Sequence, residues 1–407
     1  MSLRERTGRA RSSLLLLGPA FVAAIAYVDP GNVATNVTAG AEYGYLLVWV
    51  IVAANLMAGL IQYLSAKLGV VTGQSLPEAI RDRLPRPFRL AYWGQAELVA
   101  VATDVAEVIG GAIALQLLFG LPLLVGGVIT GVVSMALLAV QDRRGQRPFE
   151  RVITGLLLVI AVGFFASLVV SPPDPAGVAG GLVPRFEGAN SVLLAAGMLG
   201  ATVMPHAVYL HSALARDRHG RPTGRRLRQV LMATRVDVIV AMVLAGSVNL
   251  AMVLAAASTL FGREGVDTLA GAHDGLGQVL GPVVATFFAV GLLASGFAST
   301  SVGCYAGAVI MQGLLRRRIP LLLRRLATLV PALAVLAAGV EPTWALVLSQ
   351  VVLSFGVPFA LIPLVALTAR VDVLGVDVNH RLTTVFAVVA ATLIVALNVA
   401  LIVLTFR

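Results

Sequence analysis

The chain has 407 residues, of which 58% are hydrophobic and 12% are charged, and its formal net charge is +10. Soluble domains carry about a quarter charged residues, so this composition excludes an ordinary soluble protein and indicates a membrane protein. The single cysteine, Cys304, excludes a disulfide framework and a cysteine-based zinc or iron–sulfur site.

The first 25 residues are similar to a signal peptide, because arginines precede an apolar stretch. That stretch continues beyond residue 25 and equally apolar runs follow it, so we interpret it as the first membrane span. Runs of about 20 apolar residues are long enough to cross a bilayer. They predict eleven spans, with approximate limits 14–39, 45–70, 94–118, 121–140, 152–171, 191–213, 234–260, 277–312, 320–339, 343–367 and 383–406.

The arginines give an independent test of this topology. With a cytoplasmic N-terminus, the predicted cytoplasmic segments are 1–13, 71–93, 141–151, 214–233, 313–319 and 368–382. These segments contain nearly every basic residue, whereas the predicted external segments contain only Arg185 and Arg263 before the C-terminal Arg407. This asymmetry is the positive-inside pattern of membrane proteins. It explains the net charge, so we expect no binding of nucleic acid.

Two predicted spans are interrupted near their middle. The first contains AYVDPGNVATN, in which Asp29 is followed at once by Pro30, and the sixth contains Met204-Pro205. A proline fits the first turn of a helix, so each motif predicts a break followed by a second half-helix. Unwound backbone inside a membrane is tolerated only where it is buried in protein or lines a polar cavity.

The two breaks occupy corresponding positions in two halves of the chain. The sixth span comes five spans after the first, an odd offset, so the halves insert with opposite orientation. Paired interrupted helices in inverted halves indicate the binding site of a transporter. The alternative is a pair of proline kinks without a binding role.

The side chains at the breaks favour a soft divalent cation. A carboxylate at this depth is costly and indicates function, and Asp29 would neutralise a cation beside the amide of Asn32 and a free carbonyl near Ala201. Met204 adds a thioether, which favours Mn²⁺, Fe²⁺, Co²⁺ and Cd²⁺ over Mg²⁺ and Ca²⁺. The alternative is that Met204 only fills space in the core.

The motifs DPGN in the first span, ATDVAEVIGGA in the third, and MPH followed by YLHS in the sixth resemble the Nramp family of divalent-metal transporters. The resemblance implies an all-α fold of the leucine-transporter type, with a 5+5 inverted repeat, an eleventh span and a cytoplasmic N-terminus. The implied segments are 1–13 (N-terminal segment), 14–171 (first repeat), 172–190 (external loop), 191–367 (second repeat) and 368–407 (cytoplasmic loop and span eleven).

The resemblance also implies the role of individual residues. It assigns the metal site to Asp29, Asn32, the carbonyl of Ala201, Met204 and, in some conformations, Gln350, with the methionine selecting against Ca²⁺ and Mg²⁺. Mn²⁺ or Fe²⁺ is then a transported substrate, together with Cd²⁺ and Co²⁺, and neither a cofactor nor an obligatory protein partner is expected. The expected location is the bacterial plasma membrane. The chain departs from the family pattern at Asn36 and Ala207.

A second polar path is predicted along the third span, where Glu97, Asp104 and Glu107 share one helical face. Three acids in a membrane helix cannot face lipid. The resemblance implies that they carry protons together with other residues of the chain. These other residues are Asp29, His206, Arg324 and Arg325.

Arg325 is the expected partner of the acids on span three. The alternative is a buried ion-pair network that ties span three to span nine. We expect His211 to be a packing or gate residue, and we expect Lys67 and Asp237, near predicted span ends, to extend their charges toward water.

Two functions follow from these patterns. The first is a proton-coupled importer of divalent transition metals that works by alternating access. The alternative is a sodium- or proton-coupled amino-acid symporter of the same fold, although Asp29 would repel the substrate carboxylate that half-helix N-termini receive in such proteins. The sequence shows no catalytic nucleophile with a base, so an enzyme is not expected.

Overall fold

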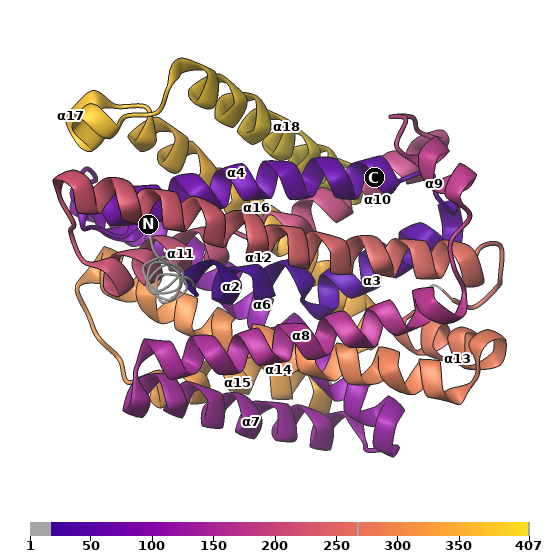
Figure 1. The fold of residues 1–407 in the computed structure, drawn as a ribbon. Helices are drawn as coiled ribbons and strands as arrows, with labels where there is room; N and C mark the ends of the chain where they lie inside the picture. Colours follow the sequence, from indigo (N-terminus) through magenta and orange to yellow (C-terminus); the bar gives the residue numbers. More distant parts are fainter. Residues whose placement is uncertain (1–17, 267, 406–407) are drawn as a thin grey trace, which may run out of the picture.

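The computed structural model describes residues 18–266 and 268–405, and both ranges consist of helices and their connections, without a strand (Figure 1). The predicted N-terminal segment 1–13 lies outside the described residues. The helices before the second break are α2 (Pro19–Ala24), η1 (Ile25–Val28), α3 (Pro30–Tyr43), α4 (Val48–Thr72), α5 (Leu76–Arg81), α6 (Arg86–Phe119), α7 (Leu123–Arg144), α8 (Gln146–Val170), α9 (Pro175–Gly181) and α10 (Gly188–Thr202).

The helices after that break complete the described chain. They are α11 (Pro205–His219), α12 (Gly224–Thr259), α13 (Leu269–Leu280), α14 (Pro282–Leu315), α15 (Leu321–Ala337), α16 (Pro342–Thr368), α17 (Val371–Leu374), η2 (Gly375–Asp377) and α18 (Arg381–Thr405). The long helices run side by side, with α9 and α13 at one end of the bundle and α17 at the other (Figure 1).

Nine helical segments within the described ranges are long and apolar enough to cross a membrane. They coincide with the predicted spans two to eight, ten and eleven, when α10 and α11 are taken together. The first predicted span is divided at Asp29, and the ninth is α15, which has 17 residues and contains the buried Arg324 and Arg325. The total of eleven spans stays a prediction.

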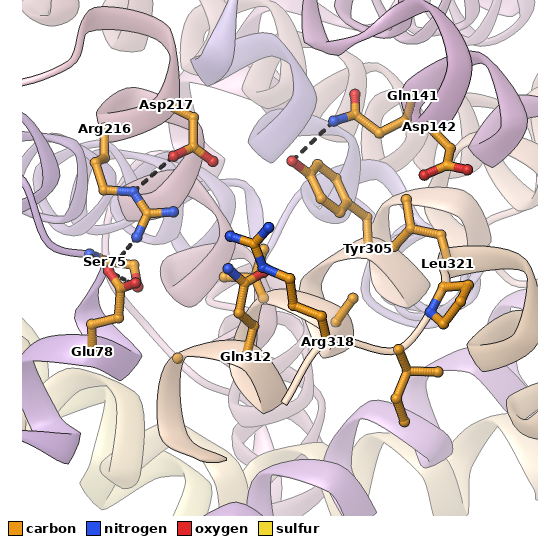
Figure 2. A pocket seen from close by; sticks show the side chains of 15 residues that line it. Ser75, Glu78, Gln141, Asp142, Arg216, Asp217, Tyr305, Gln312, Arg318 and Leu321 are labelled. Atoms are coloured by element: carbon orange, nitrogen blue, oxygen red, sulfur yellow. Dashed lines mark hydrogen bonds and ion pairs between the residues drawn. The ribbon is translucent and has the colours of Figure 1, made fainter. Parts of the chain in front are cut away.

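The arginine-rich connections meet at the α17 end of the bundle. A cavity of about 660 Å³ lies there, between α5, the C-terminal ends of α7, α11 and α14, and the connection before α15 (Figure 2). Lys67 of α4 donates a hydrogen bond to Asn379, which lies just before α18, at 2.8 Å, and is only 8% exposed, so it does not reach water as expected. Segments that the charge pattern predicts to share one side of the membrane therefore share one end of the bundle.

Close packing places the acidic helix α6 beside the first break. A Cβ atom on Gly296 of α14 would lie 2.8 Å from the Cα atom of Gly111 of α6, and a Cβ atom on Gly110 would lie 2.1 Å from Cβ of Pro30. Only glycine permits such an approach. The side of α6 that packs against the core therefore lies directly against both α14 and the start of α3.

Candidate functional site

The first break is a turn capped by its own carboxylate. Helix α2 continues into the 3-10 helix η1, and Asp29 then adopts an extended conformation with φ −69° and ψ 166°. Its side chain accepts hydrogen bonds from the backbone N–H groups of Asn32 at 3.0 Å and Gly31 at 3.3 Å. An aspartate at this position satisfies the free donors of α3 and lies at the positive end of the helix dipole.

The carbonyl groups freed by the first break bind to two neighbouring helices. Asn249 of α12 donates to the carbonyl of Tyr27 at 2.7 Å, and Ser295 of α14 donates to the carbonyl of Val28 at 2.6 Å. All four residues are buried. The unwound backbone is thereby satisfied inside the protein, as a membrane-embedded break requires.

The second break is built differently. Helix α10 ends at Thr202, Met204 is extended with φ −76° and ψ 120°, and Pro205 begins α11. The Met204 side chain is fully buried and makes no hydrogen bond that caps α11. The start of α11 therefore combines backbone donors with a soft sulfur rather than with a carboxylate.

The two breaks meet through one amide. The side-chain nitrogen of Asn32 donates to Oδ1 of Asp29 and, at 2.8 Å, to the carbonyl oxygen of Ala201 in the last turn of α10. Both neighbours are acceptors, so the amide nitrogen stands between them, and Oδ1 of Asn32 has no hydrogen-bond partner among the described residues. Three of the predicted metal ligands are thus in direct contact.

Gln350 of α16 borders the same place. A Cβ atom on Gly31 would lie 1.9 Å from Nε2 of Gln350 and 3.1 Å from Oδ2 of Asp29. Within the described chain, neither polar atom of the Gln350 side chain has a hydrogen-bond partner, although the residue is only 8% exposed. The Gln350 amide is therefore free to bind a ligand beside the carboxylate of Asp29.

A cavity leads to this place from the α9/α13 end. It measures about 420 Å³, lies between α3, α10 and α16, and extends from Glu42 and Asn190 to Gly31 and Gln350. Thr35 and Thr38 line its α3 wall. In this conformation the cavity therefore reaches Gly31 and Gln350, beside the first break, from the α9/α13 end.

The acids of α6 form two ion pairs. Arg324 pairs with Glu97 at 2.6 Å, and Arg325 makes a buried pair with Asp104. Thr300 of α14 adds a hydrogen bond to Asp104 at 2.6 Å. Arg325 was the expected partner, and Arg324 is a partner as well.

Glu107 differs from the other two acids. It is fully buried, and neither of its carboxylate oxygens has a hydrogen-bond partner among the residues that the structure describes. A buried carboxyl group without a partner is costly and is not explained by a structural ion-pair network. The network alternative therefore accounts for Glu97 and Asp104 but not for Glu107.

The two histidines of α11 have different surroundings. His206 is 2% exposed, and its ring nitrogens have no partner in the described ranges. His211 shares a hydrogen bond of 2.7 Å with Oε1 of Gln62, whose amide nitrogen donates to the hydroxyl of Tyr27 at 2.6 Å. His211 is therefore linked through Gln62 to Tyr27, just before the first break.

Some residues that support the breaks were missed from the sequence. Asn249 and Ser295 are polar residues in largely apolar helices, where a polar side chain indicates a buried polar contact. Asn36, one of the departures from the family pattern, donates to Oδ1 of Asn249 at 3.0 Å. Asn36 therefore helps to position Asn249, which binds the carbonyl of Tyr27 at the first break.

The interpretation of Asp237 was wrong. Its side chain is buried and accepts hydrogen bonds from the N–H groups of Gly18 and Ala20, each at 3.0 Å. It therefore satisfies the start of α2 instead of reaching water. A contact over more than 200 residues leaves no local trace in the sequence.

Comparison with known proteins decides the family. The model of the family described as natural resistance-associated macrophage protein-like, Nramp, matches residues 20–404. The chain belongs to the Nramp family. A divalent metal cation transporter MntH of Mycobacterium tuberculosis is 65% identical over 396 residues, which cover 97% of this chain and 92% of that protein. The divalent metal cation transporter MntH of Bacillus subtilis is 50% identical over 400 residues, which cover 98% of this chain and 94% of that protein.

Solved structures agree with the family. The Eremococcus coleocola manganese transporter, in complex with an aromatic bis-isothiourea substituted compound, superposes with a TM-score of 0.85 at 33% identity and covers 96% of this chain and 87% of that one. Mhp1, a nucleobase-cation-symport-1 family transporter, shares the fold alone, with a TM-score of 0.61 at 18% identity over 95% and 91% of the two chains. This Nramp chain is a multi-pass transporter of the plasma membrane with the predicted all-α fold, and not an enzyme.

Proposed function

We propose that this Nramp protein imports divalent transition-metal ions, chiefly Mn²⁺ and Fe²⁺, by alternating access coupled to proton movement. The MntH relatives and the manganese transporter support the substrate class. We assign the metal to the meeting point of the two breaks, with the arginine-rich α17 end in the cytoplasm. The inverted repeats 14–171 and 191–367 are part of this proposal.

The observation that carries the assignment is the contact of Asn32 with Asp29 and Ala201. A cation would replace the amide nitrogen between the two oxygens, and rotation of the amide would present Oδ1 of Asn32 as a third oxygen ligand. The carboxylate neutralises one charge of the ion, and the neutral donors complete a shell that still permits release. Met204 and Gln350 supply the remaining proposed ligands.

The burial of Met204 at the second break supports a site that selects transition-metal ions over Ca²⁺ and Mg²⁺. A thioether binds soft ions and gives little to Ca²⁺ or Mg²⁺, which prefer oxygen ligands and, for Mg²⁺, keep their water. The site would therefore favour Mn²⁺, Fe²⁺, Co²⁺ and Cd²⁺. We treat each as transported substrate rather than as a resident cofactor.

The unpartnered Glu107 supports proton coupling. It lies on the α6 face that also carries Asp104 and Glu97, so the three acids run from the breaks toward the α17 end. We propose that Asp29, Glu107, Asp104, Glu97 and His206, with Arg324 and Arg325, form the proton route. Glu107→Gln should weaken internal acidification of liposomes more than metal uptake. Equal losses of the two would contradict a proton role.

The amino-acid symporter is the second candidate, and the geometry disfavours it. The carboxylate of Asp29 already occupies the N-terminus of α3, where a substrate carboxylate would bind in such a protein. The test is uptake of Mn²⁺ into liposomes, with Ca²⁺ as competitor and a pH-sensitive dye inside. Uptake of an amino acid without Mn²⁺ uptake would reverse the assignment.

A further inference from the structure

The short helix α5 connects two parts of the transporter at the α17 end. On one side it packs against α14. Arg81 donates to the carbonyl of Gly313 at 3.0 Å, and a Cβ atom on Gly313 would lie 2.5 Å from Cβ of Pro77. The absence of a side chain at Gly313 therefore allows α5 to lie directly on α14.

On its other side, α5 is bonded to α11, the half-helix that follows the second break. The backbone N–H of Leu76 donates to the hydroxyl of Ser212 at 2.8 Å, and Arg216 forms an ion pair with Glu78. Both side chains of that pair are 20% exposed. Figure 2 shows the guanidinium of Arg216 between the carboxylates of Glu78 and Asp217, on the wall of the 660 Å³ cavity.

Glu78 is held in place before it meets the arginine. Its Oε2 atom accepts from the backbone N–H of Ser75 at 2.7 Å, as in a capping box, and also from the Ser75 hydroxyl at 2.9 Å. Burial opposes ionisation of this carboxyl, but the Ser75 N–H and the Arg216 guanidinium outweigh it and hold the pKa of Glu78 below its usual value. The pair is therefore charged at neutral pH.

The position of these contacts matters because the metal site is approached from the opposite end. Helix α11 begins at the second break, so it is the segment that a hinge at Met204 would move. Opening toward the α17 end requires α11 to separate from its neighbours there. The bonds between α5 and α11 would then break, while those between α5 and α14 could persist.

We propose that Glu78 and Arg216 are positioning residues that keep the second half-helix against α5 while the metal site faces the α9/α13 end. Their separation accompanies opening toward the α17 end. The pair touches neither the metal site nor the row of acids on α6. This inference rests on the proposed alternating access, but its test does not need metal transport.

The test measures access to two introduced cysteines in the full chain, in a Cys304→Ala background. Leu193→Cys lies on the wall of the 420 Å³ cavity, and Ala215→Cys is a buried position on α11. Glu78→Gln keeps the capping box, which accepts glutamine, but removes the charge. It should raise the alkylation rate at position 215 about threefold to tenfold and lower the rate at 193, because a half-buried pair shifts a two-state equilibrium by about this factor.

Further variants distinguish a pair that holds α11 against α5 from a pair that only stabilises the fold of α5. Arg216→Gln should reproduce the effect of Glu78→Gln, and the double variant should add little. Ser75→Ala removes the hydroxyl that bonds Oε2 of Glu78 but keeps the pair, so it should change the two rates less than Glu78→Gln does. Asp372→Asn breaks an exposed pair between α17 and Arg370, which lies just before it, and should leave the two rates unchanged. Unchanged rates in Glu78→Gln, or an equal effect of Ser75→Ala, would overturn the proposal.

The Mn²⁺ affinity of Glu78→Gln, measured by calorimetry, should stay within about threefold of the parent, since a population shift of this size changes apparent affinity only modestly. A loss of binding far beyond that factor would contradict a positioning role. Absence of Mn²⁺ uptake by the parent would instead refute the proposed function, and the alkylation rates would still report on the pair.

Discussion

The two broken helices differ in what holds them. The first break carries its own cap in Asp29, and its free carbonyls bind to Asn249 and Ser295 on α12 and α14. The second break has no side-chain cap at Met204, and its carbonyl at Ala201 binds to Asn32 of the first break. The first break is thus fixed by two long helices, whereas the second depends on the first. In the proposed metal site, the charged ligand Asp29 would therefore lie at the break that two helices fix, and the neutral ligand Met204 at the break that depends on it.

The largest effect should follow from removing the charge at the fixed break. Asp29→Ala should lower the affinity for Mn²⁺ by more than about 100-fold, because among the described residues no other carboxylate bonds the bridging amide of Asn32. Calorimetry and liposome uptake measure this loss. Asp174→Ala is the matched control, because Asp174 caps the exposed helix α9 in the same way, through the N–H groups of Ala176 and Gly177. Unchanged affinity in Asp29→Ala would remove the carboxylate from the site.

A smaller effect, on selectivity, should follow at the second break. Met204→Ala should retain Mn²⁺ uptake within about tenfold but admit Ca²⁺ or Mg²⁺, because the loss of the sulfur leaves only oxygen and amide ligands. Competition by Ca²⁺ during Mn²⁺ uptake measures the change. Met198→Ala, at a buried methionine within α10, is the control for lost packing. A Met204→Ala protein as selective as the parent would make the methionine a packing residue.

The smallest effect should concern stability. Ser295→Ala removes the donor to the carbonyl of Val28 and should lower the free energy of unfolding by about 1–2 kcal/mol, since a buried acceptor is left without a partner. Thr202→Ala removes only a hydroxyl that bonds within its own helix, to the carbonyl of Met198 at 2.6 Å, and should cost less. Thermal unfolding in detergent compares the two. An equal or reversed order would contradict the view that the first break is the anchored one.

The breaks could be predicted from sequence because their chemistry is local. Asp29-Pro30 and Met204-Pro205 each hold a residue that leaves the helix and a proline that begins the next one. The periodicity of Glu97, Asp104 and Glu107 likewise placed them on one face. Both arginines of α15 were expected beside these acids, but their division between Glu97 and Asp104 required the structure.

The supports of the site could not be predicted, for a physical reason. Asn249 and Ser295 contact the first break over more than 200 residues of chain, and a single sequence carries no record of such a pairing. The same holds for Asp237 at the start of α2. The contacts of α5 with α11 and α14 could not be predicted either. Only its cap at Ser75 follows a local sequence pattern.

The amide of Asn32 has a consequence for the empty transporter. A carrier that has released its ion must return with its pocket vacant, and a bare carboxylate buried in a membrane would resist that step. Here the amide hydrogens of Asn32 span Asp29 and Ala201 and take over part of the role of the ion. If the metal binds at the proposed site, the unloaded protein would therefore return without an uncompensated carboxylate at its centre.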